Sequence, residues 1–421
     1  MRRTSSTRQK AAGRFVVGVA VAGLLAAACG SVDADEPGGG ASLPITSGGG
    51  AGPVVVEVER TEPSPREDTR PGLTTFSDPL PELPEPTIDL SQLRSGGPPP
   101  DGIPSISNPV FHAASSVDYL TPTSPVLAVE INGDARAYPI DVMVWHEIVN
   151  DTVGDVPVAV QYCPLCNSAT VVDRRVEGRV LEFGVSGLLY NSSLVMYDRQ
   201  TRTLWSHFAS RPLYGALGEA ELVDYPSTIV GFEEWRDAYP DGLVLSRDTG
   251  VDRPYGTNPY PGYDDVGADP FLFEGEVEVD GRYTAMTRMV GITSGAAATA
   301  FPLLELRAAG AIETQLAGEP VVAFWVPGSA SALDASDLSG GVDVGATGVF
   351  SPVVGDETLT FSAIDGVITD AETGSTWNIF GKAIDGELAG THLDQVVHVD
   401  TFWFAWNAFH PDSSVASAAG D

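Results

Sequence analysis

The sequence has few basic residues. Its 421 residues include 23 Lys and Arg against 57 Asp and Glu, so the formal net charge is −34. Binding to nucleic acid depends on Lys and Arg side chains that neutralise phosphates, and this composition excludes it. The same acidity repels anionic lipid head groups, so an attachment to a membrane must come from a lipid on the chain itself.

Several motifs of known chemistry are also missing. The sequence contains no phosphate-cradling Gly-rich loop followed by Lys, no Gly-x-Ser-x-Gly elbow and no His-Glu-x-x-His zinc motif. It has only three cysteines, Cys29, Cys163 and Cys166. The apolar content of 43% is nevertheless ample for a hydrophobic core.

The first thirty residues read as an export signal. Five basic residues precede an apolar run, residues 15–28, which is shorter than the roughly 20 apolar residues of a membrane-spanning helix. The run ends in Ala-Ala-Ala-Cys29-Gly, which resembles the bacterial lipobox, although Ala26 stands where Leu is usual. We therefore expect a signal peptide over residues 1–28 and a lipid on Cys29, which anchors the chain to the outer face of the bacterial cell membrane. Ordinary cleavage with release is the alternative.

Residues 29–102 have the composition of a tether. Gly-Gly-Gly and Pro-Pro-Pro runs flank a stretch rich in Pro, Glu and Ser. Such a composition buries too little apolar surface to offset the loss of chain entropy on folding. We expect the ordered part to begin near Ile103.

The rest of the chain contains an internal repeat. Five motifs recur in the same order: Ala137–Ile140 as Ala300–Leu303, Val156–Ala159 as Glu319–Ala323, Asp198–Trp205 as Asp370–Trp377, Gly215–Gly218 as Gly386–Gly390, and Phe232–Trp235 as Trp403–Trp406. Collinear matches favour duplication of a unit of roughly 120 residues, a normal domain size. The expected domains are residues 103–253 and 286–421, with residues 254–285 as a linker or covering loop.

Short strands dominate the expected secondary structure. Val126–Ile131 and Ala135–Ile140 flank Asn132-Gly133-Asp134, a turn sequence that tolerates positive φ and predicts a hairpin. Three segments have helical character: Asp141–His146, Phe232–Tyr239 and Leu303–Ala309. The sequence therefore predicts an α+β, β-rich fold of two tandem related domains, the second a degenerate copy.

The most informative motif is the dithiol Cys163-Pro-Leu-Cys166. Three interpretations compete for it. A metal knuckle would bind copper or zinc, with further ligands from His, Met or carboxylate. A redox pair would exchange thiols with disulfides, although no amphipathic helix follows it as in thioredoxin. An inert disulfide in a scaffold or partner-binding lipoprotein is the third.

The second copy helps to choose partners for the cysteines. It replaces Gln161–Ser168 with Phe324–Ser331 and so lacks both sulfurs, and it also lacks counterparts of Trp145-His146-Glu147 and Met196. The leading hypothesis is therefore a soft-metal site of Cys163, Cys166, His146 and Met196. In the redox alternative Cys163 attacks, Cys166 resolves and His146 is the base. In either case Glu147 would orient the His146 imidazole, and His207 is a weaker candidate.

Four long motifs carry a family resemblance. They are Trp145–Asp151, Tyr162–Ser168, Phe183–Asn191 and Met196–Arg202. On these motifs, and from about Pro125 to the end, the chain resembles a bacterial family called domain of unknown function 3179. The resemblance marks the Cys163/Cys166 region as the family signature and implies no activity, fold or cofactor. Substrate and protein partner stay open.

Overall fold

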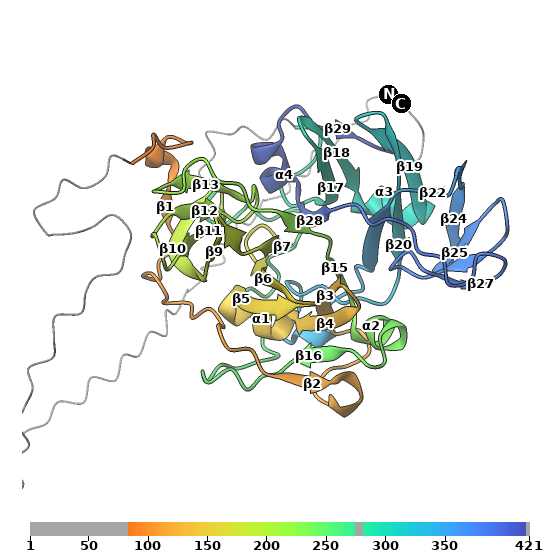
Figure 1. Cartoon of the computed structure of the whole chain (residues 1–421), viewed down its shortest axis with the longest axis horizontal. Helices are drawn as coiled ribbons and strands as arrows, with labels where there is room; N and C mark the ends of the chain where they lie inside the picture. The colour runs from red at the N-terminus through yellow and green to blue at the C-terminus, as the bar shows by residue number, and fades with distance from the viewer. Residues whose placement is uncertain (1–82, 274–280, 418–421) are drawn as a thin grey trace, which may run out of the picture. The chain divides into compact units, whose positions relative to one another are not determined.

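The computed structural model describes residues 83–273 and 281–417. The chain divides into two units, Met1–Asp78 and Pro79–Asp421, and the described residues all belong to the second. This unit is rich in β-strands and contains four α-helices within the described ranges (Figure 1). The predicted β-rich α+β class is therefore confirmed.

The first half contains a mixed sheet in the order β15-β3-β4-β16-β2. Its strands are β2 (Phe111–Ala113), β3 (Pro125–Ile131), β4 (Asp134–Pro139), β15 (Thr228–Gly231) and β16 (Leu243–Leu245). Strands β3 and β4 form the predicted hairpin, because Asn132 and Gly133 take up the positive φ values of 52° and 84° that its turn requires. Strand β16 runs parallel to β4, and the other neighbours are antiparallel.

A second sheet of the first half has the order β14-β7-β6-β5 and carries the dithiol. Its strands are β5 (Ile148–Val153), β6 (Val156–Cys163), β7 (Ser168–Asp173) and β14 (Asp224–Tyr225), and the small hairpin β8 (Arg175–Val176) and β9 (Arg179–Val180) follows β7. Seven of the eight residues of β6 are buried, as expected for a central strand covered on both faces. The end of β6 therefore delivers Cys163 into the protein interior.

The third sheet of this half has the order β1-β10-β11-β12-β13. Its strands are β1 (Arg94–Ser95), β10 (Phe183–Tyr190), β11 (Ser193–Asp198), β12 (Leu204–Ser206) and β13 (Arg211–Tyr214). The buried Asp198 accepts hydrogen bonds from the Thr201 amide and, at 3.1 Å, from Trp205 Nε1. Asp370 makes the same pair of bonds with Thr373 and Trp377, which explains why the Asp…Trp motif recurs.

The second half repeats this order of elements. Its sheets contain β17 (Arg288–Ser294), β18 (Ala297–Pro302), β28 (His398–Phe402) and β29 (Ser414–Val415); β19 (Ala311–Leu316), β20 (Glu319–Val326) and β21 (Ala346–Phe350); β22 (Val353–Val354) and β23 (Glu357–Thr358); and β24 (Phe361–Ile364), β25 (Val367–Asp370), β26 (Thr376–Trp377) and β27 (Ala383–Asp385). The order β28-β17-β18-β29, with β29 parallel to β18, matches β15-β3-β4-β16.

Each half has two short α-helices: α1 (Ile140–His146), α2 (Phe232–Ala238), α3 (Leu303–Ala309) and α4 (Trp403–Phe409). The first three agree with the predicted segments to within one residue at either end. The sequence analysis missed α4, because Trp403–Asn407 is buried on all sides and lacks the polar face that marks an amphipathic helix. Short 3₁₀ turns occur at Leu90–Gln92, Ala114–Ser116 and Leu338–Gly340.

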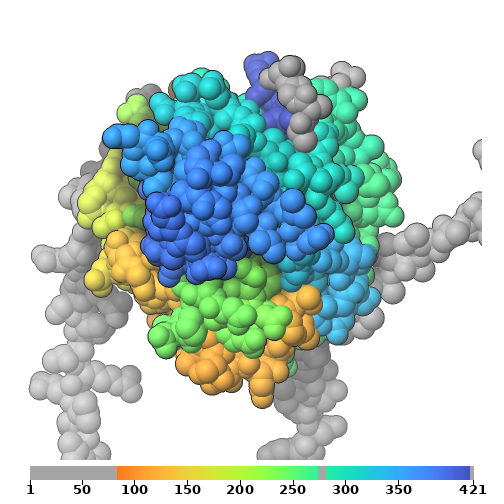
Figure 2. All heavy atoms as spheres, turned by 90° about the vertical axis from the view of Figure 1, so that its right-hand side faces the viewer, coloured from red at the N-terminus to blue at the C-terminus, as the bar shows by residue number. Residues whose placement is uncertain are grey.

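The two halves pack closely against each other. A Cβ on Gly231 would lie 2.2 Å from the Gly328 carbonyl oxygen, so the backbones meet there with no room for a side chain. The Tyr239 and Phe380 rings meet edge to face at 5.1 Å. Figure 2 shows this face, with the blue strands of the second half directly against the green segment around α2. One hydrophobic cluster includes both cysteines together with Trp403 and Trp406.

The folded part begins earlier than the sequence analysis placed it. Strand β1 pairs with β10, and Thr87 Oγ1 donates to the Pro212 carbonyl at 2.8 Å, although both segments fall within the predicted tether 29–102. The Pro-rich composition concealed this, because these contacts are made to distant strands. The predicted signal peptide and Cys29 lie outside the described residues. Among the helices that are described, none has the length and apolarity to cross a membrane.

Candidate functional site

The two cysteines flank the turn that joins β6 to β7. Cys163 and Ser168 form the last residue pair of the hairpin, and Pro164 to Asn167 make the turn. The Asn167 amide donates to the Pro164 carbonyl at 3.3 Å, and Asn167 has a φ of 50°. Proline fixes the start of such a turn, and Asn tolerates the left-handed conformation at its end. The motif therefore encodes a rigid turn that holds both sulfurs at one end of the hairpin.

Both thiols are free and buried. Cys163 is 2% exposed and Cys166 is fully buried. The second half holds the turn from one side, since Thr401 Oγ1 donates to the Cys166 carbonyl at 2.9 Å. Tyr263 holds it from another, because its hydroxyl donates to the Leu165 carbonyl at 2.8 Å. Burial of both sulfurs means that a reagent reaches them only when the residues that cover the turn, Tyr263 and Thr401 among them, move aside.

A chain of hydrogen bonds leads away from Cys166. Cys166 Sγ lies 2.9 Å from Ser168 Oγ, and Ser168 Oγ lies 2.8 Å from His207 Nε2. His207 Nδ1 contacts Gln161 Oε1 at 2.9 Å and Thr170 Oγ1 at 3.1 Å. With Gln161 Oε1 as an acceptor, the proton of the neutral imidazole sits on Nδ1 and Nε2 faces Ser168. The arrangement can pass a proton from the thiol to the imidazole through the serine hydroxyl.

The two thiols differ in acidity. Burial raises the pKa of Cys163 well above its usual value, and hydrogen bonding and charge from Cys166 add to this. Burial also acts to raise the pKa of Cys166, but hydrogen bonds from Cys163, Ser168 and Ser193 outweigh it and hold the pKa below that of an ordinary thiol. Burial lowers the pKa of His207, so the imidazole favours its neutral form. Cys166 is therefore the more acidic thiol of the pair.

Glu147 is the ionisable group whose charge interacts with Cys163. It follows α1 with a φ of 59° and is 8% exposed. Burial, with the charge of Cys163, raises the pKa of Glu147 well above its usual value. A left-handed, non-glycine residue at this point indicates that the fold accepts backbone strain to place this carboxyl. A carboxyl with a raised pKa favours its protonated form, and it can donate this proton to a sulfur that leaves near Cys163.

The structure places the other two predicted ligands, His146 and Met196, in different surroundings. His146 Nδ1 lies 2.7 Å from the Pro104 carbonyl and Nε2 lies 2.7 Å from Tyr255 Oη, so both ring nitrogens are used away from the cysteines. Met196 is buried in the same hydrophobic cluster as the two cysteines and pairs across strands with Trp205. Within residues 83–273 and 281–417, no group of three or more His, Cys, Asp or Glu residues is arranged to hold a metal ion.

The sequence analysis missed most of the hydrogen-bonding chain. Ser168 and Gln161 belong to the dithiol motif but carry no recognisable spacing, and His207 lies far from it in the chain. The second half differs at the matching positions: Phe324 stands where the first half has Gln161, and Ser329 where it has Cys166. The buried Ser329 hydroxyl has no hydrogen-bond partner among the described residues.

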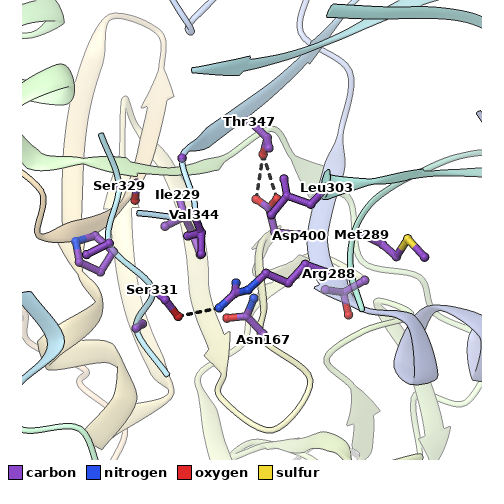
Figure 3. A pocket seen from close by; sticks show the side chains of 15 residues that line it. Asn167, Ile229, Arg288, Met289, Leu303, Ser329, Ser331, Val344, Thr347 and Asp400 are labelled. Carbon is purple, nitrogen blue, oxygen red and sulfur yellow. Dashed lines mark hydrogen bonds between the residues drawn. The ribbon is translucent and has the colours of Figure 1, made fainter. Parts of the chain in front are cut away.

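A small pocket separates the dithiol turn from the matching turn of the second half. Its volume is about 40 Å³, and Asn167, Ser331 and Asp400 are among the residues that line it. Figure 3 shows the Arg288 guanidinium between Asn167 and Ser331, to whose hydroxyl it donates at 2.7 Å. Thr347 Oγ1 donates to Asp400 at 2.9 Å on the opposite wall. The pocket has room for water or a molecule of similar size.

The fold and the site define a two-halved β-rich protein with a buried, hydrogen-bonded dithiol at a hairpin turn. The chain belongs to the family described as "Protein of unknown function (DUF3179)", whose model matches residues 100–413. The resemblance found in the sequence is therefore confirmed. No curated protein and no solved structure matches the chain.

Proposed function

We propose that Cys163 and Cys166 form a redox-active dithiol that exchanges with disulfide-bonded substrates. One observation carries the proposal: Cys166 is joined through Ser168 to His207, and its pKa is lowered while that of its neighbour Cys163 is raised. A thiolate beside a protonated second thiol is the arrangement that thiol–disulfide exchange requires. This assignment exchanges the roles predicted from the sequence, where Cys163 attacks and His146 is the base.

The exchange proceeds in two balanced steps. Cys166 passes its proton through Ser168 to His207, and the thiolate attacks one sulfur of the substrate disulfide. A Cys166–substrate disulfide forms, and the other substrate sulfur leaves as a thiolate that takes the proton back. Glu147 then donates its proton to the departing substrate sulfur and takes the proton of Cys163, whose sulfur attacks Cys166 Sγ. The Cys163–Cys166 disulfide forms, the second substrate thiol leaves with the Glu147 proton, and two electrons have passed to the substrate.

Copper or zinc binding is a second proposal. It rests on three sulfurs, those of Cys163, Cys166 and Met196, which lie in one hydrophobic cluster and are soft ligands that favour Cu(I). His146 takes no part in this version, because both of its ring nitrogens are already engaged. An inert disulfide in a scaffold protein is the remaining alternative.

Two further proposals concern the evolutionary origin of the two halves and the cellular location of the protein. The matching strand orders of the two halves, with a strand parallel to the hairpin in each, support an internal duplication whose second copy lost the dithiol. The basic, then apolar, N-terminal sequence ending at Cys29 supports an extracytoplasmic lipoprotein anchored at the outer face of a bacterial membrane. In that oxidising compartment a dithiol needs a partner that resets it.

A redox titration tests the proposed function. The full chain carrying Cys29→Ser has only two thiols and is equilibrated in glutathione buffers of increasing oxidised fraction. We expect both thiols to disappear together in one reversible two-electron transition. The chain carrying Cys29→Ser, Cys163→Ser and Cys166→Ser is the control. Metal that co-purifies near one equivalent and prevents oxidation would favour the metal proposal. Thiols that never oxidise, with no metal present, would contradict both.

A further inference from the structure

A second polar pocket lies at the N-terminal end of α1, apart from the dithiol. Its volume is about 330 Å³, within the range of about 300–1,000 Å³ that is usual for small-molecule sites. The wall brings together five parts of the chain, among them Tyr119, Asp141 and Arg247, with Tyr255–Thr257 and Ser336–Ser339. The proposed redox mechanism uses none of these residues.

A fixed ion pair forms part of this wall. Arg247 Nε donates to Asp141 Oδ2 at 2.8 Å, and Nη2 donates to the same oxygen. The Arg247 guanidinium lies over the Tyr119 ring, with 4.6 Å between Cζ and the ring centroid. The Asp141 side chain is 7% exposed and that of Arg247 is 32% exposed. The pair is therefore rigid, and its guanidinium is the more accessible member.

The ion pair is not fully satisfied. Asp141 Oδ1 is buried and has no hydrogen-bond partner in the described part of the chain. Buried polar atoms in native proteins nearly always have a partner, and an unpaired one needs an explanation. The atom has almost no exposed surface, so a donor the size of a hydroxyl group reaches it only after a small shift of the pocket wall. A ligand hydroxyl in the pocket would supply the missing bond.

The charges of the wall select against ions. Asp141 neutralises Arg247, and the remaining charged residue of the wall is Asp337, so the pocket carries about one net negative charge. Anions are repelled, and a cation meets the guanidinium beside Asp141. Hydroxyl groups of Thr257, Ser336 and Ser339 supply both donors and acceptors. Neutral compounds rich in hydroxyl groups match this set.

His146 has a place in this pocket. Tyr255, a lining residue, has its hydroxyl 2.7 Å from His146 Nε2 and 2.6 Å from Thr249 Oγ1. His146 is in turn held by the Pro104 carbonyl. The imidazole thus positions the tyrosine in the wall, which accounts for His146, a residue that the dithiol site leaves unexplained.

We propose that this pocket binds a neutral polyhydroxyl compound of the sugar or polyol class, whose hydroxyls donate to Asp141 Oδ1 and accept from Arg247. The site is independent of the dithiol, so the triple Cys→Ser chain binds as the parent does.

Isothermal titration of the full chain with glycerol, myo-inositol, D-glucose and trehalose tests the proposal, with choline and inorganic phosphate as charged comparisons. We expect one-to-one binding of at least one neutral compound. Asp141→Asn should weaken it at least tenfold. Thr257→Trp, at an exposed position, should fill the pocket and abolish it, whereas Thr358→Trp, at an exposed position on β23, should not. Absence of binding by all four compounds, preference for a charged probe, or binding that survives Thr257→Trp would overturn the proposal.

Discussion

Replacing Ser168 with Ala is expected to make Cys166 a much weaker acid. The serine hydroxyl lies 2.9 Å from Cys166 Sγ, and its hydrogen bond is one of those that hold the Cys166 pKa below the ordinary thiol value. A hydrogen bond to a charged group contributes about 1.5–3 kcal/mol. Its loss should lower the acidity of Cys166 by about tenfold or more. At a given pH below the new midpoint, the fraction of Cys166 that is present as thiolate falls accordingly.

Thiolate absorbance at 240 nm measures this in the chain carrying Cys29→Ser and Cys163→Ser, where Cys166 is the remaining thiol. Ser193→Ala should have a smaller effect, because its hydroxyl lies 3.6 Å from Cys166 Sγ. His398→Gln is the matched control, a buried histidine of the second half outside the hydrogen-bonding chain. A Ser168→Ala chain that titrates like its parent would show that the chain of hydrogen bonds does not govern Cys166.

Replacing Glu147 with Gln is expected to stabilise the reduced fold and to slow the second exchange step. The folded-state pKa of Glu147 is raised by burial, so the folded chain holds this proton at pH values where the unfolded chain has lost it. The stability of the parent therefore falls as pH rises from the unfolded pKa through the folded one. Glutamine does not titrate, so the variant lacks this loss. The second exchange step also loses the proton that Glu147 donates, and acid–base catalysis of this kind contributes about 10²–10⁴-fold to a rate.

Two measurements check this prediction. Denaturant unfolding at several pH values should show that the parent, and not Glu147→Gln, loses stability across that window. Rapid acid quenching with mass analysis should show that the Cys166–glutathione intermediate accumulates in the variant. Glu177→Gln is the matched control, because Glu177 also has a positive φ, of 49°, but is exposed. A variant that resolves the intermediate at the parent rate would remove Glu147 from the mechanism.

Local sequence patterns were sufficient to predict much of the fold. The Asn132-Gly133 hairpin and the helices at residues 140, 232 and 303 follow from turn chemistry and short-range periodicity, and the structure contains them. Helix α4 was not predicted because every face of it is buried, and β1 was not predicted because its stability comes from pairing with β10. Contacts between distant segments leave no local periodicity in either place.

The candidate site, like the fold, could be predicted from the sequence only in part. The motif Cys163-Pro-Leu-Cys166 predicted the turn around which the candidate site is built, and the second half has a matching turn without either sulfur. His207 was only a weaker candidate, because it reaches the turn only where β12 ends beside β11 and β7. His146 is close to Glu147 in the chain, yet its ring is used on the other side of α1. Neighbourhood in sequence was a poor guide to neighbourhood in space.

The most direct test asks which sulfur attacks. Chains carrying Cys29→Ser with either Cys163→Ser or Cys166→Ser each keep a single reactive thiol, and both react with oxidised glutathione at pH 7 under mass analysis. We predict that the Cys163→Ser chain forms one stable glutathione adduct on Cys166 at least tenfold faster than the Cys166→Ser chain forms one on Cys163. Faster reaction at Cys163, or no adduct on either chain, would contradict the assignment of Cys166 as the thiolate of a redox centre.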